Sequence, residues 1–497
     1  MFLDYLELFR NGFKLFIPDA FLGFSLLLLL IVGVFIKTEE NEALSLKNIN
    51  WLSLEVLGLM ILLMMNHPYY SGIILNGMIF INYFTLIIKI IIILSCGIVL
   101  LMGFQYYEYE KLNSFEFSIL ILLAALGMSL LASSYDFMMV YLAIELQSLS
   151  FYILASFKRD SQFSTEAGLK YFILGALSSG ILLFGCSLIY GLTGSTNFES
   201  LNHLLMNSVF QFNELNTGIS VAITFIIVAL LFKLAAAPFH MWAPDVYEGA
   251  PTIVTAFFAI VPKIAVLTLL IQLLLESFYG LISQWQQLLI FSSMTSMILG
   301  AVGAIEQKKI KRFLAYSAIG HVGYLLIGLS CGTLEGLQSV IIYIIIYMIM
   351  SINVFCIILS LYKKTDSTRI IYINEFTGLS KENPLLAITF SVMVLSMAGI
   401  PPLAGFISKL QIFYSAIASS LILLAIIGVL TSVLGAVYYI RFVKIIYFEN
   451  YNSFIYKELD LTKSIIISIT FLSIIFFLFN PSYILILSHD LSLNLSL

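Results

Sequence analysis

The chain has 497 residues, of which 61% are hydrophobic and only 10% are charged. Ordinary soluble domains carry about 25% charged residues, so this chain lacks the polar surface that water requires and a soluble protein is excluded. Apolar runs of about 20 residues recur along the whole chain, and each can cross a hydrocarbon core of roughly 30 Å as a helix. The sequence therefore predicts an all-α integral membrane protein.

Fourteen membrane-spanning helices are predicted in chain order. Their ranges are 17–36, 52–65, 73–103, 117–135, 137–157, 168–192, 219–238, 252–275, 286–305, 313–331, 336–361, 385–408, 415–443 and 464–487. The beginning of the chain does not read as a cleavable signal peptide, because Asp4, Glu7 and Asp19 flank Arg10 and Lys14 and no small-residue cleavage site follows the first apolar run. We expect the first helix to be retained.

Basic residues gather in one set of connections. If successive helices alternate in direction, the connections after odd-numbered helices hold Lys37, Lys47, Lys111, Lys158, Arg159, Lys308, Lys309, Lys311, Arg312, Lys363, Lys364, Arg369, Lys381, Arg441, Lys444, Lys457 and Lys463. The connections after even-numbered helices hold none, and only Arg10 and Lys14 dissent. By the positive-inside rule, the basic connections face the cytoplasm or the mitochondrial matrix, and both termini lie on the opposite side.

The remaining basic residues fall inside predicted spans, or directly after one in the case of Lys409, and the acid Glu145 is similarly placed. They are Lys89, Lys170, Lys233, Lys263, Lys409 and Glu145. An ionisable group at membrane depth costs at least about 2.5–3.5 kcal/mol, so each needs a partner, a wet cavity or a function. Burial disfavours the charged form of a lysine and a nearby carboxylate favours it, so a row of such groups can pass a proton. The sequence predicts a proton-conducting set of residues inside the helix bundle.

A purely structural role stays open for two of these residues. Lys89 has no acid nearby in the sequence, and it could snorkel or simply line the bundle. Lys170 follows Glu166 by one helical turn, so a local ion pair is a second interpretation. Lys233 and Lys263 have no such neighbour, and proton transfer is the favoured role for them.

Two predicted spans are interrupted beside a lysine. The span 219–238 ends in KLAAAPFHMWAP, where Pro238 removes a backbone donor, and the span 385–408 contains GIPPLAGFISK, with Pro401 and Pro402 in its interior. Broken backbone at membrane depth is tolerated only against protein or water, and corresponding breaks in two halves are typical of repeat-built transporters. We therefore predict two five-helix repeats, helices 4–8 and 9–13. Because each repeat has an odd number of helices, the second copy is inverted relative to the first.

These repeats give the predicted domain boundaries. They are a three-helix segment over 1–115, repeats over 116–275 and 276–446, and a C-terminal helix over 447–497. The cysteines and histidines form no set at metal-ligand spacing, and packing thiols are the favoured interpretation of the cysteines. The residues concerned are Cys96, Cys186, Cys331, Cys356, His67, His203, His240, His321 and His489.

Six segments together resemble one known family. They are VYLAIELQSLSFYILASFKRD, EAGLKYFILGALSSGILLFG, KLAAAPFHMWAPDVYEGAPTIVTAFF, VPKIAVL, KRFLAYSAIGHVGYLLIGL and GIPPLAGFISKLQIF. In this order and spacing they resemble the subunit 2 family of respiratory complex I, the proton-pumping NADH:ubiquinone oxidoreductase, in its mitochondrial form. The similar subunit 4 family places a glutamate where Lys409 stands, and the subunit 5 family continues into extra helices after the fourteenth.

The resemblance implies a role for each ionisable residue in the spans other than Lys89. Glu145 and Lys233 would form a switching ion pair, and Lys170 matches the lysine of the sixth helix. Lys263 would be the central relay, and Lys409, at the broken twelfth helix, would exchange protons with one side.

Further residues match the family at the breaks and in the second half. His240, just past Pro238, matches a position at the first helix break. His321 would support the second half-channel, and a hydrogen-bonded packing histidine is the alternative. Tyr247, Glu248 and Pro251 would shape the connection between the seventh and eighth helices.

The resemblance also implies a function. The chain would move protons across the inner mitochondrial membrane, with both termini on the intermembrane-space side, in response to NADH oxidation and quinone reduction elsewhere in the complex. NADH, FMN, iron–sulfur clusters and ubiquinone would belong to the wider complex, and this chain would bind no cofactor or metal. Its partners would be other membrane subunits, subunit 4 and subunit 4L among them, accessory subunits and lipids, with no nucleic acid. A subunit of a multisubunit sodium/proton antiporter is the alternative.

Overall fold

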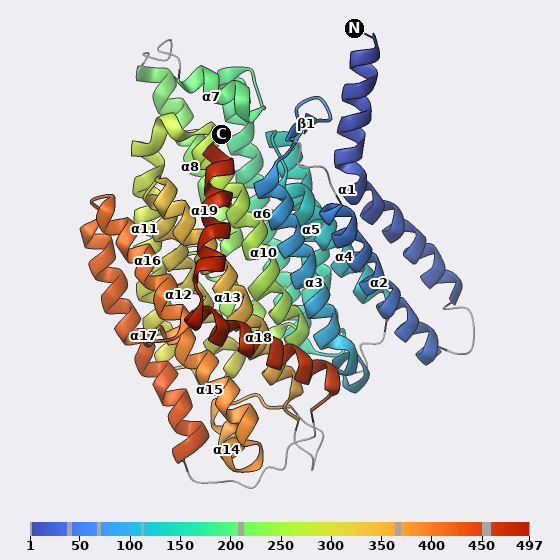
Figure 1. Ribbon diagram of the computed structural model, residues 1–497, viewed down its shortest axis with the longest axis vertical. Coiled ribbons are helices and arrows are strands. Elements are labelled where there is room, and N and C mark those ends of the chain that lie inside the picture. Colours follow the sequence, from blue (N-terminus) through green and yellow to red (C-terminus); the bar gives the residue numbers. More distant parts are fainter. Residues whose placement is uncertain are drawn as a thin grey trace. The chain divides into compact units, whose positions relative to one another are not determined.

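The fold is known from a computed structural model that describes residues 2–36, 42–66, 71–110, 114–206, 213–362, 369–449 and 459–496. Within these residues thirteen helices are long and apolar enough to cross a membrane. Two shorter helices, α15 (Pro384–Ala398) and α16 (Ala404–Ala418), together form the twelfth predicted span (Figure 1). The predicted all-α membrane fold is confirmed, and its seventh and twelfth spans are the broken ones.

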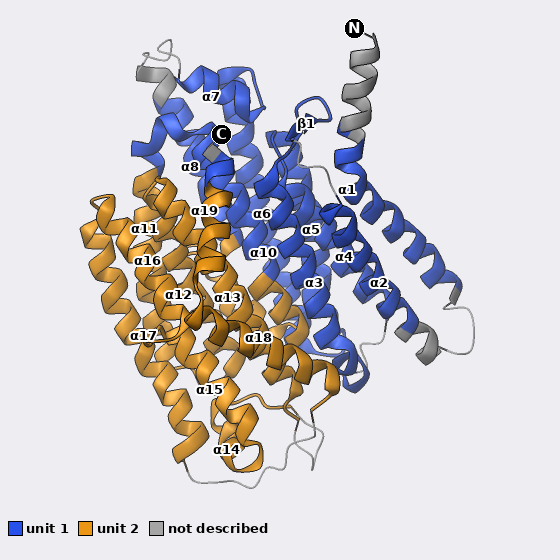
Figure 2. Cartoon of the chain, in the orientation of Figure 1, with its two compact units in different colours: residues 1–233, 261–285, 493–497 blue, residues 234–260, 286–492 orange. Residues whose placement is uncertain are grey.

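The described residues form two compact units, residues 1–233, 261–285 and 493–497 and residues 234–260 and 286–492 (Figure 2). The first unit contains α1 (Phe2–Ile36), α2 (Glu42–Met65), β1 (Gly72–Ile74), β2 (Ile79–Ile81), α3 (Tyr83–Tyr109), α4 (Phe115–Ala132), α5 (Phe137–Ala155), α6 (Gln162–Thr193), α7 (Phe198–Met206), most of α8 (Asn213–Leu234), a π-helical turn η2 (Leu273–Ser277) and a 3-10 turn η3 (Tyr279–Leu281). The second unit contains α9 (Trp242–Gly249), α12 (Ile310–Ser330), α13 (Leu334–Ser360), η4 (Ile373–Phe376), α14 (Leu379–Glu382), α15, α16, α17 (Ile422–Phe448), α18 (Leu461–Phe479) and most of α19 (Ser482–Ser496). Besides α8 and α19, two more helices have residues in both units, α10 (Thr252–Gln272) and α11 (Ile282–Ile305). The division follows packing and leaves the predicted repeat boundaries as predictions.

Small residues allow close helix packing in the first unit. There α4 packs against α1, α2, α3 and α5, and α6 packs against α5. A Cβ added at Gly127 on α4 would lie 2.9 Å from the backbone nitrogen of Gln147 on α5. Close backbone approach at glycine replaces the hydrophobic driving force that lipid removes.

The second unit is built around α13, the buried helix of this half. It packs against α12, α15, α16 and α18, and most of its residues are buried. Its amide side chain of Asn353 donates to the carbonyl oxygen of Ile467 at 3.1 Å and to the hydroxyl of Thr470 at 2.8 Å, both on α18. Helix α18 is thereby held by hydrogen bonds as well as by apolar contact.

Several predicted boundaries were wrong. The third span begins at Tyr83 and not at 73, because residues 72–81 form an antiparallel hairpin and Asn82 then caps the helix by accepting from the backbone nitrogen of Thr85 at 2.8 Å. The second half of the twelfth span runs to Ala418, well past the predicted end at 408. The last span ends at Phe479, where Asn480 and Pro481 separate it from α19.

The basic residues used for the orientation fall on different parts of the structure. Lys463, placed in a connection by the sequence, instead lies buried at the start of α18 and donates to the carbonyl oxygen of Leu359 at 3.2 Å. Others lie outside the described residues, as does His67; they are Lys37, Lys111, Lys363, Lys364 and Lys457.

Candidate functional site

Glu145 and Lys233 form the acid and base of the first unit. Glu145 is half-buried on α5, and its Oε2 accepts from the Ser148 hydroxyl at 3.3 Å. Lys233 stands at the end of α8 with its Nζ enclosed and donating to no described residue. The Glu145 charge acts on this ammonium, and the Nζ lies 5.9 Å from the ring centroid of Tyr152. The two charges therefore interact without a direct hydrogen bond between them.

The helix is interrupted directly after Lys233, since α8 ends at Leu234. Ala235 has a φ of 59°, the Ala237–Pro238 peptide is cis, and the chain resumes as α9 at Trp242. The freed carbonyl of Ala237 accepts from Thr295 at 3.0 Å, and His240 is buried within the break. These contacts meet the requirement that broken backbone at membrane depth be satisfied by protein.

Lys263 lies in the interior of α10, on a stretch of the helix that is buried all round. A lysine enclosed in this way must be compensated or able to lose its proton. It belongs to the same unit as Glu145 and Lys233.

Lys170 forms the local ion pair that was the second interpretation of this residue from the sequence. Its Nζ lies 2.7 Å from Glu166, one turn earlier on α6, and the two side chains are 43% and 59% exposed. The exposed position distinguishes it from the enclosed lysines, and its role in proton transfer stays a prediction.

The second unit holds Lys409 at the other break. Lys409 is buried on α16, and its Nζ donates to the carbonyl oxygens of Met397 at 3.0 Å and Ala398 at 2.8 Å. These are the last carbonyls of α15, which the break leaves without helical partners and where the helix dipole is negative. The Nζ also lies 4.8 Å from the ring centroid of Tyr324. The broken helix thus supplies the acceptors that hold the buried ammonium.

Two glycines and two prolines permit this arrangement. Gly399 ends α15 with a φ of 81°, and a Cβ there would lie 2.8 Å from Cδ of Lys409. A Cβ at Gly405 would lie 1.8 Å from the carbonyl oxygen of Ser396, so the two half-helices meet at backbone distance. Pro401 and Pro402, joined by a cis bond, form the connection between them.

His321 and Lys409 line the same cavity in the second unit, together with Ser317, Tyr324 and Thr431. The Nδ1 of His321 lies 2.6 Å from the hydroxyl of Tyr343 on α13, and its Nε2 lies 3.3 Å from that of Tyr439 on α17. The Tyr439 hydroxyl also bonds Ser317. Both ring nitrogens of His321 are hydrogen-bonded, as expected of a histidine with a packing role. The same residue also belongs to the polar lining of the cavity beside Lys409.

The connection after α9 is held by charge. Glu248 pairs with Lys309, and Lys311 donates to the carbonyl oxygen of Ala250 at 2.7 Å. Tyr247 is buried beside them, and Pro251 lies at the start of α10, where its carbonyl oxygen accepts from Thr255. Glu248 therefore binds basic residues at the start of α12, in keeping with a structural role.

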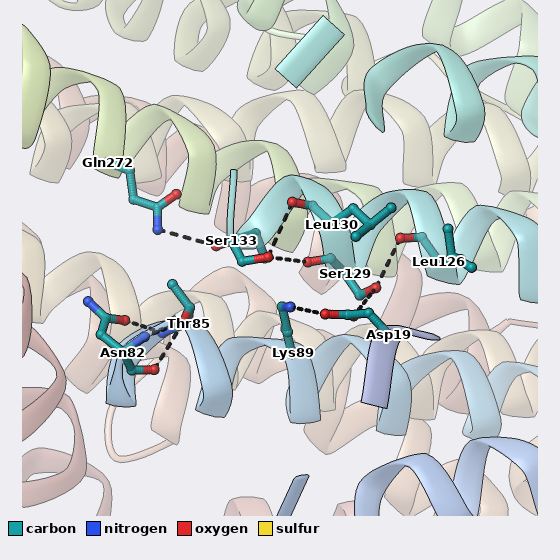
Figure 3. A network of polar contacts seen from close by, with 10 residues as sticks. Asp19, Asn82, Thr85, Lys89, Leu126, Ser129, Leu130, Ser133 and Gln272 are labelled. Atoms are coloured by element: carbon teal, nitrogen blue, oxygen red, sulfur yellow. Dashed lines mark hydrogen bonds and ion pairs between the residues drawn. The ribbon is translucent and has the colours of Figure 1, made fainter. Parts of the chain in front are cut away.

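Lys89 is paired with an acid that lies far from it in the sequence. The Nζ of Lys89 on α3 lies 2.6 Å from Oδ2 of Asp19 on α1, and the side chains are 1% and 2% exposed. Oδ1 of Asp19 accepts from the Ser129 hydroxyl on α4 at 2.9 Å (Figure 3). Lys89 therefore neither snorkels toward the membrane surface nor lies unpaired inside the bundle. Asp19 lies inside the predicted span 17–36 and could have been found there as a second buried acid.

The described part of the chain contains no cluster of metal-ligating side chains. Among the described residues, no three histidine, cysteine or acidic side chains are placed to hold a metal ion. All four cysteines are buried and none forms a disulfide.

Known proteins are similar in sequence to this chain over most of its length. The family model described as "NADH:quinone oxidoreductase/Mrp antiporter, TM" matches residues 134–435. NADH-ubiquinone oxidoreductase chain 2 of Marchantia polymorpha is 48% identical over 99% of this chain and 100% of its own length, and that of Arabidopsis thaliana is 44% identical over 99% of both. NADH-quinone oxidoreductase subunit N of Pelagibacter ubique is 44% identical over 88% of this chain and 90% of its own length.

Solved structures share the fold. A chain of respiratory complex I from Thermus thermophilus superposes with a TM-score of 0.78 at 27% identity and covers 94% of this chain and 98% of that one. A chain of the Mrp complex from Dietzia sp. gives 0.81 at 19% identity, over 97% and 98%, and shows the fold alone. With the family match and the identity over its full length, the chain belongs to the NADH-ubiquinone oxidoreductase chain 2 family, the antiporter-like membrane subunits of respiratory complex I.

Proposed function

We propose that this multi-pass membrane protein translocates protons across the inner mitochondrial membrane as part of a multisubunit NADH:ubiquinone oxidoreductase. The observation that supports this most is the enclosed Nζ of Lys233, beside a helix break and within the field of Glu145. A buried ammonium without a hydrogen-bond partner is costly, so its protonation responds strongly to a change in the neighbouring charge. That sensitivity is what a driven proton relay requires.

The proposed roles follow the two units. In the first, Glu145 controls the charge on Lys233, and Lys263 receives the proton, with Lys170 as a more exposed member. In the second, Lys409 holds a proton against the end of α15, and His321 with its tyrosine partners lines the cavity beside it. His240, Pro238, Pro401 and Pro402 are positioning residues at the breaks. Coupled groups of this kind titrate together, so no single residue sets the pH at which the track works.

The energy for this movement would come from NADH oxidation and quinone reduction on other subunits. NADH, FMN, iron–sulfur clusters and ubiquinone are proposed to bind there, and this chain is proposed to carry no redox group. Moving one charge through 100 mV requires roughly 2.3 kcal/mol, an amount that a change in one buried charge pair can supply. Subunit 4 and subunit 4L, accessory subunits and lipids are the proposed neighbours, and both termini are placed on the intermembrane-space side by the positive-inside rule.

The test is proton pumping by the assembled complex carrying Lys233→Ala or Glu145→Ala. We expect complex of normal abundance with lower NADH-driven quinone reduction and fewer protons moved per NADH. Lys381→Ala is the matched control, because this lysine is exposed on α14 and outside the proposed track. Wild-type turnover and proton ratio in both track variants would refute the proposal.

A sodium/proton antiporter subunit is the second candidate, favoured by the fold shared with the Mrp complex of Dietzia sp.. Purification of the chain with its partners separates the two. NADH-driven quinone reduction in the preparation supports the oxidoreductase, and cation exchange without it would support the antiporter.

A further inference from the structure

A group of unpartnered polar atoms lies at the end of α10, away from both helix breaks. The carbonyl oxygen Oε1 of Gln272, Oε2 of Glu276 and the hydroxyl of Ser277 are all buried, and none forms a hydrogen bond with any residue that the structure describes. The side chains of Gln272 and Ser277 are 1% and 0% exposed. Buried polar atoms in folded proteins are almost always paired, so three such atoms within six residues require a physical cause.

The local backbone brings these atoms to one side of the helix. Residues Leu273–Ser277 form a π-helical turn, closed by a hydrogen bond from the nitrogen of Phe278 to the carbonyl oxygen of Leu273 at 3.0 Å. Because the turn closes between residues five apart, positions four and five residues apart share a face, which places Gln272, Glu276 and Ser277 on one side of the helix. Single π-turns inside α-helices are frequent at functional sites.

The orientation of the Gln272 amide is fixed by its other end. Its Nε2 donates to the carbonyl oxygen of Ala132, the last residue of α4, at 3.2 Å, and Figure 3 shows the side chain reaching toward this end of α4. Its Oε1 is consequently an acceptor that needs a donor. An ionised Glu276 offers only further acceptors, whereas a protonated Glu276 offers the O–H donor that is missing.

The charges around Glu276 also favour its neutral form. The helix α7 packs against the π-turn, and Glu199 lies on α7. Tyr135, just after α4, lies within electrostatic reach of both Glu276 and Glu199. Neither of these neighbours carries a positive charge that would stabilise an ionised Glu276, and its burial disfavours the charged form. On α7, the buried side-chain oxygen of Asn202 likewise bonds no residue that the structure describes.

We propose that Glu276 is a further proton-holding residue of this subunit, which carries a proton at neutral pH and shares it with Gln272 at the π-turn. Water is the ligand expected to complete the site, since Ser277 and the second lone pairs of the carbonyl oxygens remain to be bonded. The assignment to proton translocation rests on the proposed function, but the protonation itself does not.

Protonation is tested directly by chemical labelling of the intact complex with dicyclohexylcarbodiimide. This hydrophobic reagent takes the carboxyl proton on its nitrogen, and the carboxylate oxygen then adds to its central carbon, so it marks protonated acids. Peptide mass spectrometry at neutral pH is expected to find Glu276 labelled at least tenfold more than the exposed Glu199, which serves as the internal control. Equal labelling of the two, or none at Glu276, would overturn the proposal.

The role in translocation is tested with Glu276→Gln, which is isosteric with the protonated acid and is expected to assemble normally. The number of protons moved per NADH should fall by at least half, and Tyr279→Phe, at an exposed position on the following turn η3, should keep the wild-type ratio. A wild-type ratio in Glu276→Gln, with loss in Lys233→Ala, would exclude Glu276 from the track and leave the proposed function intact. A wild-type ratio in both would refute the proposed function itself.

Discussion

Removal of one charge from the Lys89–Asp19 pair is expected to loosen the amino-terminal helices. At 2.6 Å and an effective dielectric constant near 20, the two charges attract by about 6 kcal/mol, and desolvation of each ion offsets several kcal/mol of this. The net contribution of the intact pair is therefore small. Loss of one partner leaves a buried, uncompensated charge between α1 and α3, which costs about 3–5 kcal/mol.

The variants test the contrast between the small net contribution of the intact pair and the large cost of leaving one charge unpaired. Lys89→Met is expected to be strongly destabilising, and so is Asp19→Leu, whereas the double variant is expected to recover most of the loss because no charge is left unpaired. Ser129→Ala is the graded control, since it removes only one hydrogen bond to the carboxylate, worth about 1.5–3 kcal/mol.

The assay is the rate at which the subunit leaves the purified complex on mild heating, followed by native electrophoresis. If 3 kcal/mol appears in the dissociation barrier, the rate for either single variant rises by roughly a hundredfold, at 1.4 kcal/mol per factor of ten. A double variant as labile as the single ones, or single variants as stable as the wild type, would refute the reasoning.

Three further outcomes are expected. Gly405→Ala places a Cβ 1.8 Å from the carbonyl oxygen of Ser396, so the assembled complex should be lost on native gels, and normal assembly would contradict this packing. Tyr343→Phe removes the hydroxyl 2.6 Å from Nδ1 of His321 and should cost about 1–3 kcal/mol in thermal stability, with reduced pumping if the cavity conducts protons. Lys170→Gln breaks an exposed helical pair worth about 0.3–0.5 kcal/mol, so any large loss of proton pumping at unchanged thermal stability would assign the residue to the track.

Local sequence signals were sufficient for much of the fold. Apolar runs predicted the spans, because the length and hydropathy of a membrane helix are properties of a continuous segment. Pro238, Pro401 and Pro402 identified both broken helices, since the missing donor and the ring act on the neighbouring backbone. Counting charges inside the spans found Lys233 and Lys409, because a charge at membrane depth is costly and is rarely kept there without a partner or a function.

Which groups those charges meet depends on how the helices pack. Asp19 and Lys89 are separated by 70 residues and come together because α1 and α3 both pack on α4. Lys409 finds its acceptors at the end of α15 because the break exposes carbonyls that an unbroken helix would have bonded. That ionisable groups are buried in a membrane bundle could be predicted from the sequence alone. Their partners are contributed by other helices, and a pattern read along one segment carries no information about them.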